Sequence, residues 1–162
     1  MLRSVVIILC IFTVIACNPI QTASQKKSIE PELPFACLSS QSPCDVKTEW
    51  GTFTIDFSGQ TDAGNLKTEL PFQVQLTFDA ISENIQLKSA NGYLEGKTMF
   101  MGKIPLFFEL MASSSNIARA QTLLASCSEE VMTWRLWFTV EVAKDEVIKK
   151  QEFFIDFDSQ RL

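Results

Sequence analysis

Sulfur-bearing side chains are the residues of this 162-residue chain that are best suited to chemistry. Met99 and Met101 lie two residues apart in a segment that reads as a strand, so we expect both thioethers on the same face of it. Met132 follows Cys127 by five residues, across a short turn predicted at 128–131. One thiolate and two or three thioethers are soft donors, which select Cu(I) rather than zinc or iron. The four residues therefore predict a Cu(I) site, and the alternative is a packed methionine cluster beside a buried thiol.

The chain contains no histidine. This removes the usual general base, the usual zinc ligand and every Ser–His or Cys–His pair. The adjacent Glu129 and Glu130 fall in a predicted turn, where carboxylates are ordinarily solvated. We therefore expect a binding protein rather than an enzyme, and we predict no catalytic residue.

The N-terminal segment is typical of a secretory signal. Arg3 precedes an apolar run over 5–15, which is too short to span a bilayer of about 30 Å. The run ends in a lipobox-like Val-Ile-Ala-Cys, so we expect a signal peptide over 1–16 and lipidation of Cys17, for example with palmitate. The alternative is an ordinary secretory signal in which this cysteine occurs by chance. Asn18, where Asp would signal retention at the inner membrane, favours an outer-membrane anchor facing the periplasm.

Three cysteines remain after the lipidated one, and an oxidising compartment favours a disulfide that leaves one thiol over. We favour the pair Cys37–Cys44, which encloses a short polar segment before the first strand and would contribute about 2–3 kcal/mol. Either of these cysteines could instead pair with Cys127. If Cys37 and Cys44 are joined, Cys127 is the free thiol.

Residues 17–34 are polar and rich in proline, so they predict a flexible tether that leads into a single domain over 35–162. The net charge is −5, and no basic cluster is larger than two lysines. We therefore expect no nucleic-acid partner. The membrane is expected as a partner through the lipid anchor, and an envelope protein is a second possible partner.

Alternation of apolar and polar residues with a period of two dominates the domain. About seven strands over some 120 residues indicate an all-β fold, an immunoglobulin-like antiparallel β-sandwich. We predict a turn at Asn91-Gly92, and either a helical turn or a strand over 117–125. The clearest strand segments are 53–57, 72–78, 134–142 and 153–157, with shorter ones at 85–88 and 99–108.

Trp137 is an apolar residue on an otherwise polar strand face, which it shares with Arg135 and Glu141. An exposed tryptophan can mark a surface for a protein partner. The alternative is that the tether or a crossing loop covers it.

Two segments, 92–102 and 124–134, resemble a group of small exported bacterial domains. In that group a Met-x-Met-Gly segment precedes a Leu-x-x-Cys turn, which runs into Met-x-Trp and a last long strand. The early pair Cys37…Cys44 fits the same group. More distantly, the chain is similar to the YtkA/FixH-like domains, which are immunoglobulin-like sandwiches linked by context to copper delivery and cytochrome oxidase assembly.

The resemblance implies that the four sulfur residues lie close together as a Cu(I) ligand set: Met99, Met101, Cys127 and Met132. Lys103 stands where a histidine often follows the Met-Gly in the YtkA-like domains, so this ligand set contains sulfur alone. The resulting expectation is an exported, lipid-anchored accessory protein that handles Cu(I) for oxidase assembly. The alternative is a metal-free envelope lipoprotein that binds a protein partner or acts as a scaffold.

Overall fold

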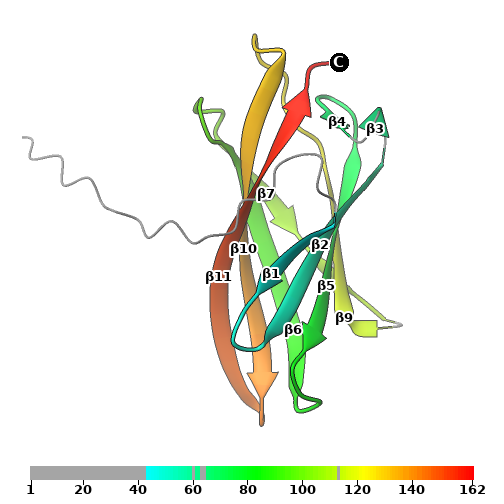
Figure 1. Ribbon diagram of the computed structural model, residues 1–162, viewed down its shortest axis with the longest axis vertical. Helices are drawn as coiled ribbons and strands as arrows, with labels where there is room; N and C mark the ends of the chain where they lie inside the picture. The colour runs from blue at the N-terminus through cyan, green and yellow to red at the C-terminus, as the bar shows by residue number, and fades with distance from the viewer. Residues whose placement is uncertain (1–42, 60, 63–64, 113) are drawn as a thin grey trace, which may run out of the picture. The chain divides into compact units, whose positions relative to one another are not determined.

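The described part of the chain is built from β-strands alone (Figure 1). The computed structural model describes residues 43–59, 61–62, 65–112 and 114–162. Their strands form two sheets that pack face to face, which confirms the expected all-β sandwich. Within these residues no helix is long and apolar enough to cross a membrane. The expected signal peptide (1–16) and tether (17–34) lie outside the described residues.

The first sheet has five strands in the order β1-β2-β5-β9-β8, and all of its neighbours are antiparallel. Its inward side chains alternate with outward polar ones, as the period of two requires. The strands are β1 (Cys44–Lys47), β2 (Gly51–Gly59), β5 (Phe72–Ala80), β8 (Glu109–Met111) and β9 (Ser114–Thr122).

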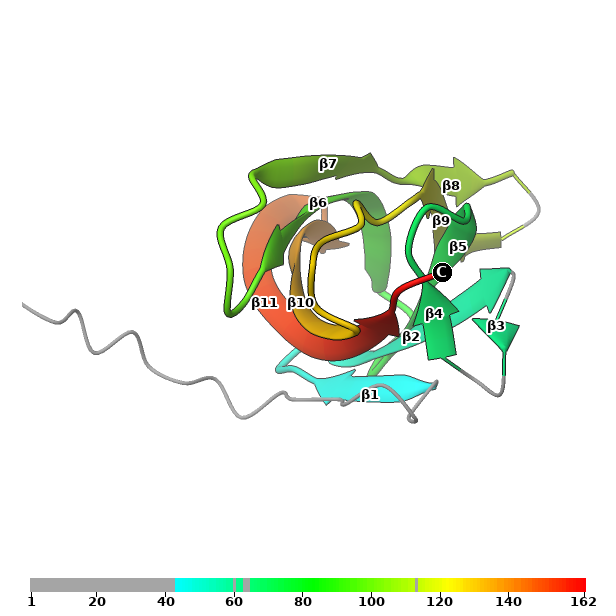
Figure 2. The same ribbon diagram turned by 90° about the horizontal axis from the view of Figure 1, so that it is seen from above.

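The second sheet has six strands in the order β3-β4-β11-β10-β6-β7. The strands are β3 (Thr61–Asp62), β4 (Asn65–Lys67), β6 (Ile85–Gly96), β7 (Lys103–Phe107), β10 (Val131–Lys144) and β11 (Val147–Gln160). The pairing of β4 with the end of β11 is parallel, which departs from the expected antiparallel arrangement. Viewed down the long axis, β7 leads end to end into β8 where the chain passes from one sheet to the other (Figure 2).

The described residues form eleven strands, so the prediction of about seven was too low. Four strands were not predicted: β3, β4 and β8 have only two or three residues each, too few to show an alternation, and β1 has four. The ambiguous segment 117–125 belongs largely to β9, because Ala118 and Ala120 are buried at alternate positions.

The predicted turn at Asn91-Gly92 was wrong, because both residues lie inside β6. Gly92 pairs with Phe138 of β10, and a side chain at this position would overlap the carbonyl oxygen of Trp137. The glycine is therefore required for a close approach of two strands rather than for a turn. As a result, β6 runs on without interruption to Gly96.

A row of phenylalanine rings joins the two sheets through the core. Phe53 of β2 stacks on Phe78 of β5 with ring centroids 4.5 Å apart, and its centroid lies 5.1 Å from that of Phe153 on β11. Phe153 in turn stacks on Phe138 of β10 at 5.0 Å. Phe53 is completely buried at the centre of this row, so it contributes to the packing of both sheets.

We predict that Phe53→Ala lowers the free energy of unfolding by about 3–5 kcal/mol, because it leaves a cavity between the sheets. Urea denaturation followed by tryptophan fluorescence measures the change. Ile81→Ala is the control, since Ile81 is 70% exposed and its loss should cost no more than about 0.5 kcal/mol. Equal losses for the two variants would contradict this account of the core.

Candidate metal site

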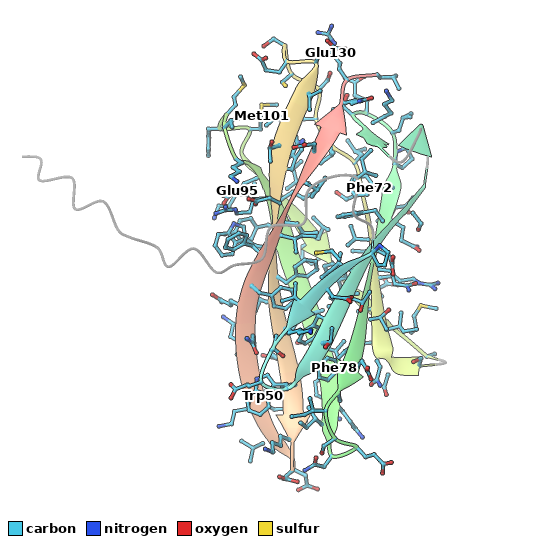
Figure 3. The ribbon with its side chains drawn as sticks, in the orientation of Figure 1. Trp50, Phe72, Phe78, Glu95, Met101 and Glu130 are labelled. Carbon is cyan, nitrogen blue, oxygen red and sulfur yellow. The ribbon has the colours of Figure 1, made fainter. Side chains whose placement is uncertain are left out.

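The candidate site lies at the end of the sandwich where three strands of the second sheet meet. Trp134 near the start of β10 pairs with Gly96 at the end of β6 and with Phe157 near the end of β11. The β6–β7 loop, residues 97–102, and the bend at 128–130 therefore lie at the same end. Met101 and Glu130 mark this end in Figure 3, while Trp50 lies at the opposite one.

Cys127 and Met132 are in direct contact at this end. The Cys127 thiol donates to Met132 Sδ, with the two sulfur atoms 3.5 Å apart, and its Sγ lies 3.8 Å from the carbonyl oxygen of Glu129. Met132 is only 4% exposed, whereas Cys127 is half-buried. Two sulfur ligands with bonds of about 2.3 Å to one metal ion lie about 3.8 Å apart in a tetrahedral arrangement. The observed separation is therefore close to that of two ligands on one metal.

Met99 and Met101 do not lie on a strand, so the expected strand over 99–108 was wrong in its first four residues. Strand β7 begins only at Lys103, which pairs with Glu95 and closes the hairpin. Gly102, with a φ of 76°, adopts a backbone conformation that side chains disfavour, and it marks the turn into β7. The two thioethers are thus carried by the β6–β7 loop, and their positions depend on how that loop folds.

The β6–β7 loop folds back onto Gly96. A side chain at Gly96 would overlap both the Cε of Met132 and the carbonyl oxygen of Met99. The Met99 main chain and the Met132 methyl group therefore lie against the same glycine. Met101 is partly buried and packs against the core cluster that contains Met132, while the Met99 side chain is 39% exposed.

The structure thus brings together two of the four predicted sulfur side chains and the main chain of a third. The fourth, Met101, packs against the same core. Among the described residues, no group of three or more histidine, cysteine, aspartate or glutamate side chains could hold a metal ion.

The two described cysteines differ in their chemical state. Cys44 is disulfide-bonded, and Cys127 is a free thiol. Cys37 and Cys17 lie outside the described residues, so the Cys37–Cys44 pairing and the lipidation of Cys17 stay predictions. A free thiol at Cys127 is what a thiolate ligand requires.

An ion triad around a buried carboxylate lies on the outer face of the same sheet, with the Lys97 side chain 44% exposed. Asp156 of β11 is 1% exposed and accepts hydrogen bonds from Arg135 Nε at 2.8 Å, Arg135 Nη2 at 3.2 Å and Lys97 Nζ at 2.7 Å. Alternation with Ile155 and Phe157 puts Asp156 on the polar face of its strand, but the sequence alone assigns it no partner. Its partners follow only from the β10–β11 register, in which Arg135 lies opposite Asp156.

Trp137 lies in a row of aromatic side chains on this outer face. Its ring centroid is 6.1 Å from that of Tyr93 and 4.9 Å from that of Phe154, and its Nε1 donates to Glu95 Oε1 at 2.7 Å. The Arg135 guanidinium carbon lies 3.8 Å from the centroid of Phe154. Side chains of its own sheet therefore cover much of Trp137. In the same row Lys103 lies over the Tyr93 ring and Arg135 over the Phe154 ring, as cation–π contacts.

Comparisons with known proteins bear on the fold alone. A scan against protein-family models gives no match, and a search of curated proteins gives none. Among solved structures, a DUF4785 family protein from Legionella pneumophila is similar with a TM-score of 0.51 and 14% sequence identity. The match covers 72% of this chain and 30% of that one, so this chain corresponds to less than a third of that protein's length. The likeness supports the β-sandwich fold.

The ion triad makes stability depend on pH. Burial by itself raises the pKa of the Asp156 carboxyl. The hydrogen bonds and charges of Arg135 and Lys97 lower this pKa by more than burial raises it, so the net pKa lies below the ordinary aspartate value. The stabilisation is therefore complete above the unfolded-state pKa, about 3.9, and is lost as the pH falls through the lower folded-state pKa.

We predict that Asp156→Asn lowers the free energy of unfolding at pH 7 by about 3 kcal/mol. The same variant should flatten the dependence of stability on pH below about pH 5. Urea midpoints measured across the acid range test both effects. Asp79→Asn, which removes an exposed carboxylate, is the control. A wild-type stability that is no steeper in acid than that of Asp156→Asn would refute the role given to the triad.

Proposed function

We propose that this chain is an exported, lipid-anchored accessory protein whose β-sandwich binds Cu(I) at its loop end. Cys127 would supply a thiolate and Met132 a thioether, with Met99 and Met101 of the adjacent loop completing the set. The observation that carries this proposal is the 3.5 Å contact between a free thiol and a buried thioether, next to a loop with two further methionines.

The donor set suits Cu(I) in both softness and accessibility. Thiolate and thioether sulfurs favour Cu(I) over the harder divalent ions. Met132 is held in the core, whereas Cys127 is half-buried and the Met99 side chain reaches solvent. Methionine side chains are flexible, so an exposed one can reach a metal that approaches from solvent. Such a site can both take up and release the ion, which is what delivery requires.

The wider role of the protein rests on the sequence resemblance to the YtkA/FixH-like domains. The Met-x-Met-Gly and Cys…Met-x-Trp segments support a role in supplying copper for the assembly of a respiratory oxidase. The expected signal and lipidated Cys17 would place the domain in the cell envelope, facing the periplasm, with the outer membrane favoured over the inner one.

A second candidate function is a metal-free lipoprotein that docks an envelope protein. Large apolar side chains are exposed in segments that flank the sulfur residues. Phe100 at the tip of the loop is 90% exposed, and Leu123 and Val131 are half exposed. Exposed apolar residues of this kind can mark a protein interface. In this alternative the methionines only fill the core beside a buried thiol.

Titration with Cu(I) against a chelator of known affinity separates the two functions. We predict that the chain from Ser28 onward binds one Cu(I), that Cys127→Ser abolishes binding, and that Met132→Leu weakens it about tenfold or more. Met111→Leu is the matched control, because Met111 lies on β8 of the other sheet. Failure of the wild-type protein to compete with the chelator would contradict the copper proposal and favour the metal-free alternative.

The lipid anchor has its own test. We predict that cells expressing the full chain incorporate labelled palmitate into it, and that Cys17→Ser abolishes both the label and recovery in the membrane fraction. Cys10→Ser is the control, since Cys10 lies within the apolar run and should keep the label. Labelling that persists in Cys17→Ser would show that the lipobox assignment is wrong.

A further inference from the structure

Both ends of the methionine-bearing β6–β7 loop are tied to the sheet by a lysine. At its start, the Lys97 backbone N–H donates to the carbonyl oxygen of Thr133 at 3.0 Å, and Lys97 Nζ donates to Asp156 at 2.7 Å. At its end, Lys103 Nζ lies 4.0 Å from a Glu95 carboxylate oxygen and 4.0 Å from the centroid of the Tyr93 ring. The loop is therefore held at two points, with the two methionines between them.

The two attachments differ in strength. The pair of Lys103 and Glu95 is long, and its carboxylate is 30% exposed, so water screens it and it stabilises little. The carboxylate that holds Lys97 is only 2% exposed, and Arg135 also donates to it. Charge-assisted hydrogen bonds to a buried carboxylate are stronger and more exacting in geometry. Of the two side-chain attachments, that of Lys97 is therefore the stronger.

The buried carboxylate joins three separate elements at one point. Asp156 belongs to β11, Arg135 to β10 and Lys97 to the first position of the loop. Arg135 is itself held in place by stacking on Phe154. Burying a carboxylate costs solvation free energy, and only such a complete set of partners offsets it. The triad thus fixes the start of the β6–β7 loop relative to β10 and β11.

The position of Lys97 bears directly on the sulfur residues. Lys97 follows Gly96, against which the Met99 main chain and the Met132 methyl group both pack. A displacement of Lys97 would move the loop backbone away from this contact. None of the three charged groups is itself a sulfur donor, so they would act on a bound metal only through the loop.

We propose that the Lys97–Asp156–Arg135 triad positions the β6–β7 loop, and with it Met99 and Met101, beside Cys127 and Met132. Lys97 and Asp156 are thus positioning residues and not ligands. The consequence for metal affinity rests on the proposed Cu(I) function, whereas the positioning of the loop can be measured without any metal.

Lys97→Met is the main variant, because it removes the ammonium group while leaving the Arg135–Asp156 pair in place. Lys97→Arg is the conservative variant, which keeps the charge. Lys150→Met is the matched control. It also breaks a 2.7 Å lysine–carboxylate pair on the second sheet, but both partners of that pair, Lys150 and Glu152, are exposed. Asp156→Asn serves as a second disruption of the triad.

Amide hydrogen exchange of the metal-free protein is the first measurement. In Lys97→Met we expect exchange of the residue-97 amide, which donates to the carbonyl oxygen of Thr133, to rise about tenfold or more, with the β10 amides of Trp134 and Leu136 unchanged. Lys97→Arg and Lys150→Met should leave both regions as in the wild type. Unchanged exchange in the loop would overturn the proposal, and so would a rise that extends through β10, since that would report global unfolding.

Cu(I) competition on the same proteins is the second measurement. Lys97→Met should weaken binding about tenfold to a hundredfold, with Lys97→Arg restoring it. If loop exchange rises and Cu(I) affinity does not change, the triad does not position ligands and that part of the proposal is overturned. If the wild-type protein binds no Cu(I), the proposed function fails, and the exchange data still decide whether the triad holds the loop.

Discussion

The register of β10 between β6 and β11 is the constraint on which the rest of the described structure depends. Because successive side chains of a strand point to opposite faces, one register assigns every residue of β10 to the core or to the outer face. It places Met132 and Trp134 in the core and Arg135 and Trp137 outside. A slip by one residue would exchange these sets, burying the Arg135 guanidinium and exposing Met132 and Trp134.

The candidate site draws on both faces that this register defines. The thiol–thioether contact of Cys127 and Met132 lies on the core side, while the carboxylate of Asp156 lies on the outer side of the same sheet. The β6–β7 loop connects them, because Lys97 reaches the outer carboxylate and the adjoining Gly96 packs on Met132. A metal bound by the loop methionines would therefore be coupled to an ion triad that it does not touch.

The sequence-based predictions failed where short-range signals competed with strand pairing. Asn91-Gly92 is a strong turn signal, yet Gly92 lies within β6 because its missing side chain admits the backbone of β10. Met99 and Met101 look like alternate strand positions, yet the hairpin closes at Lys103 and leaves both in the loop. In the first case a contact between segments distant in the chain outweighed the local pattern, and in the second the nearby pairing of Glu95 with Lys103 did so.

The sequence by itself determined the fold class and the inward faces of the long strands, because burial on a sheet requires a period of two. It also placed Cys127 and Met132 on the two sides of one short turn, since their separation is local. Only the tertiary structure decided the strand register, the loop conformation at Met99 and Met101, and the burial of Asp156. These depend on pairs such as Lys97 and Asp156, 59 residues apart, whose meeting no local pattern encodes.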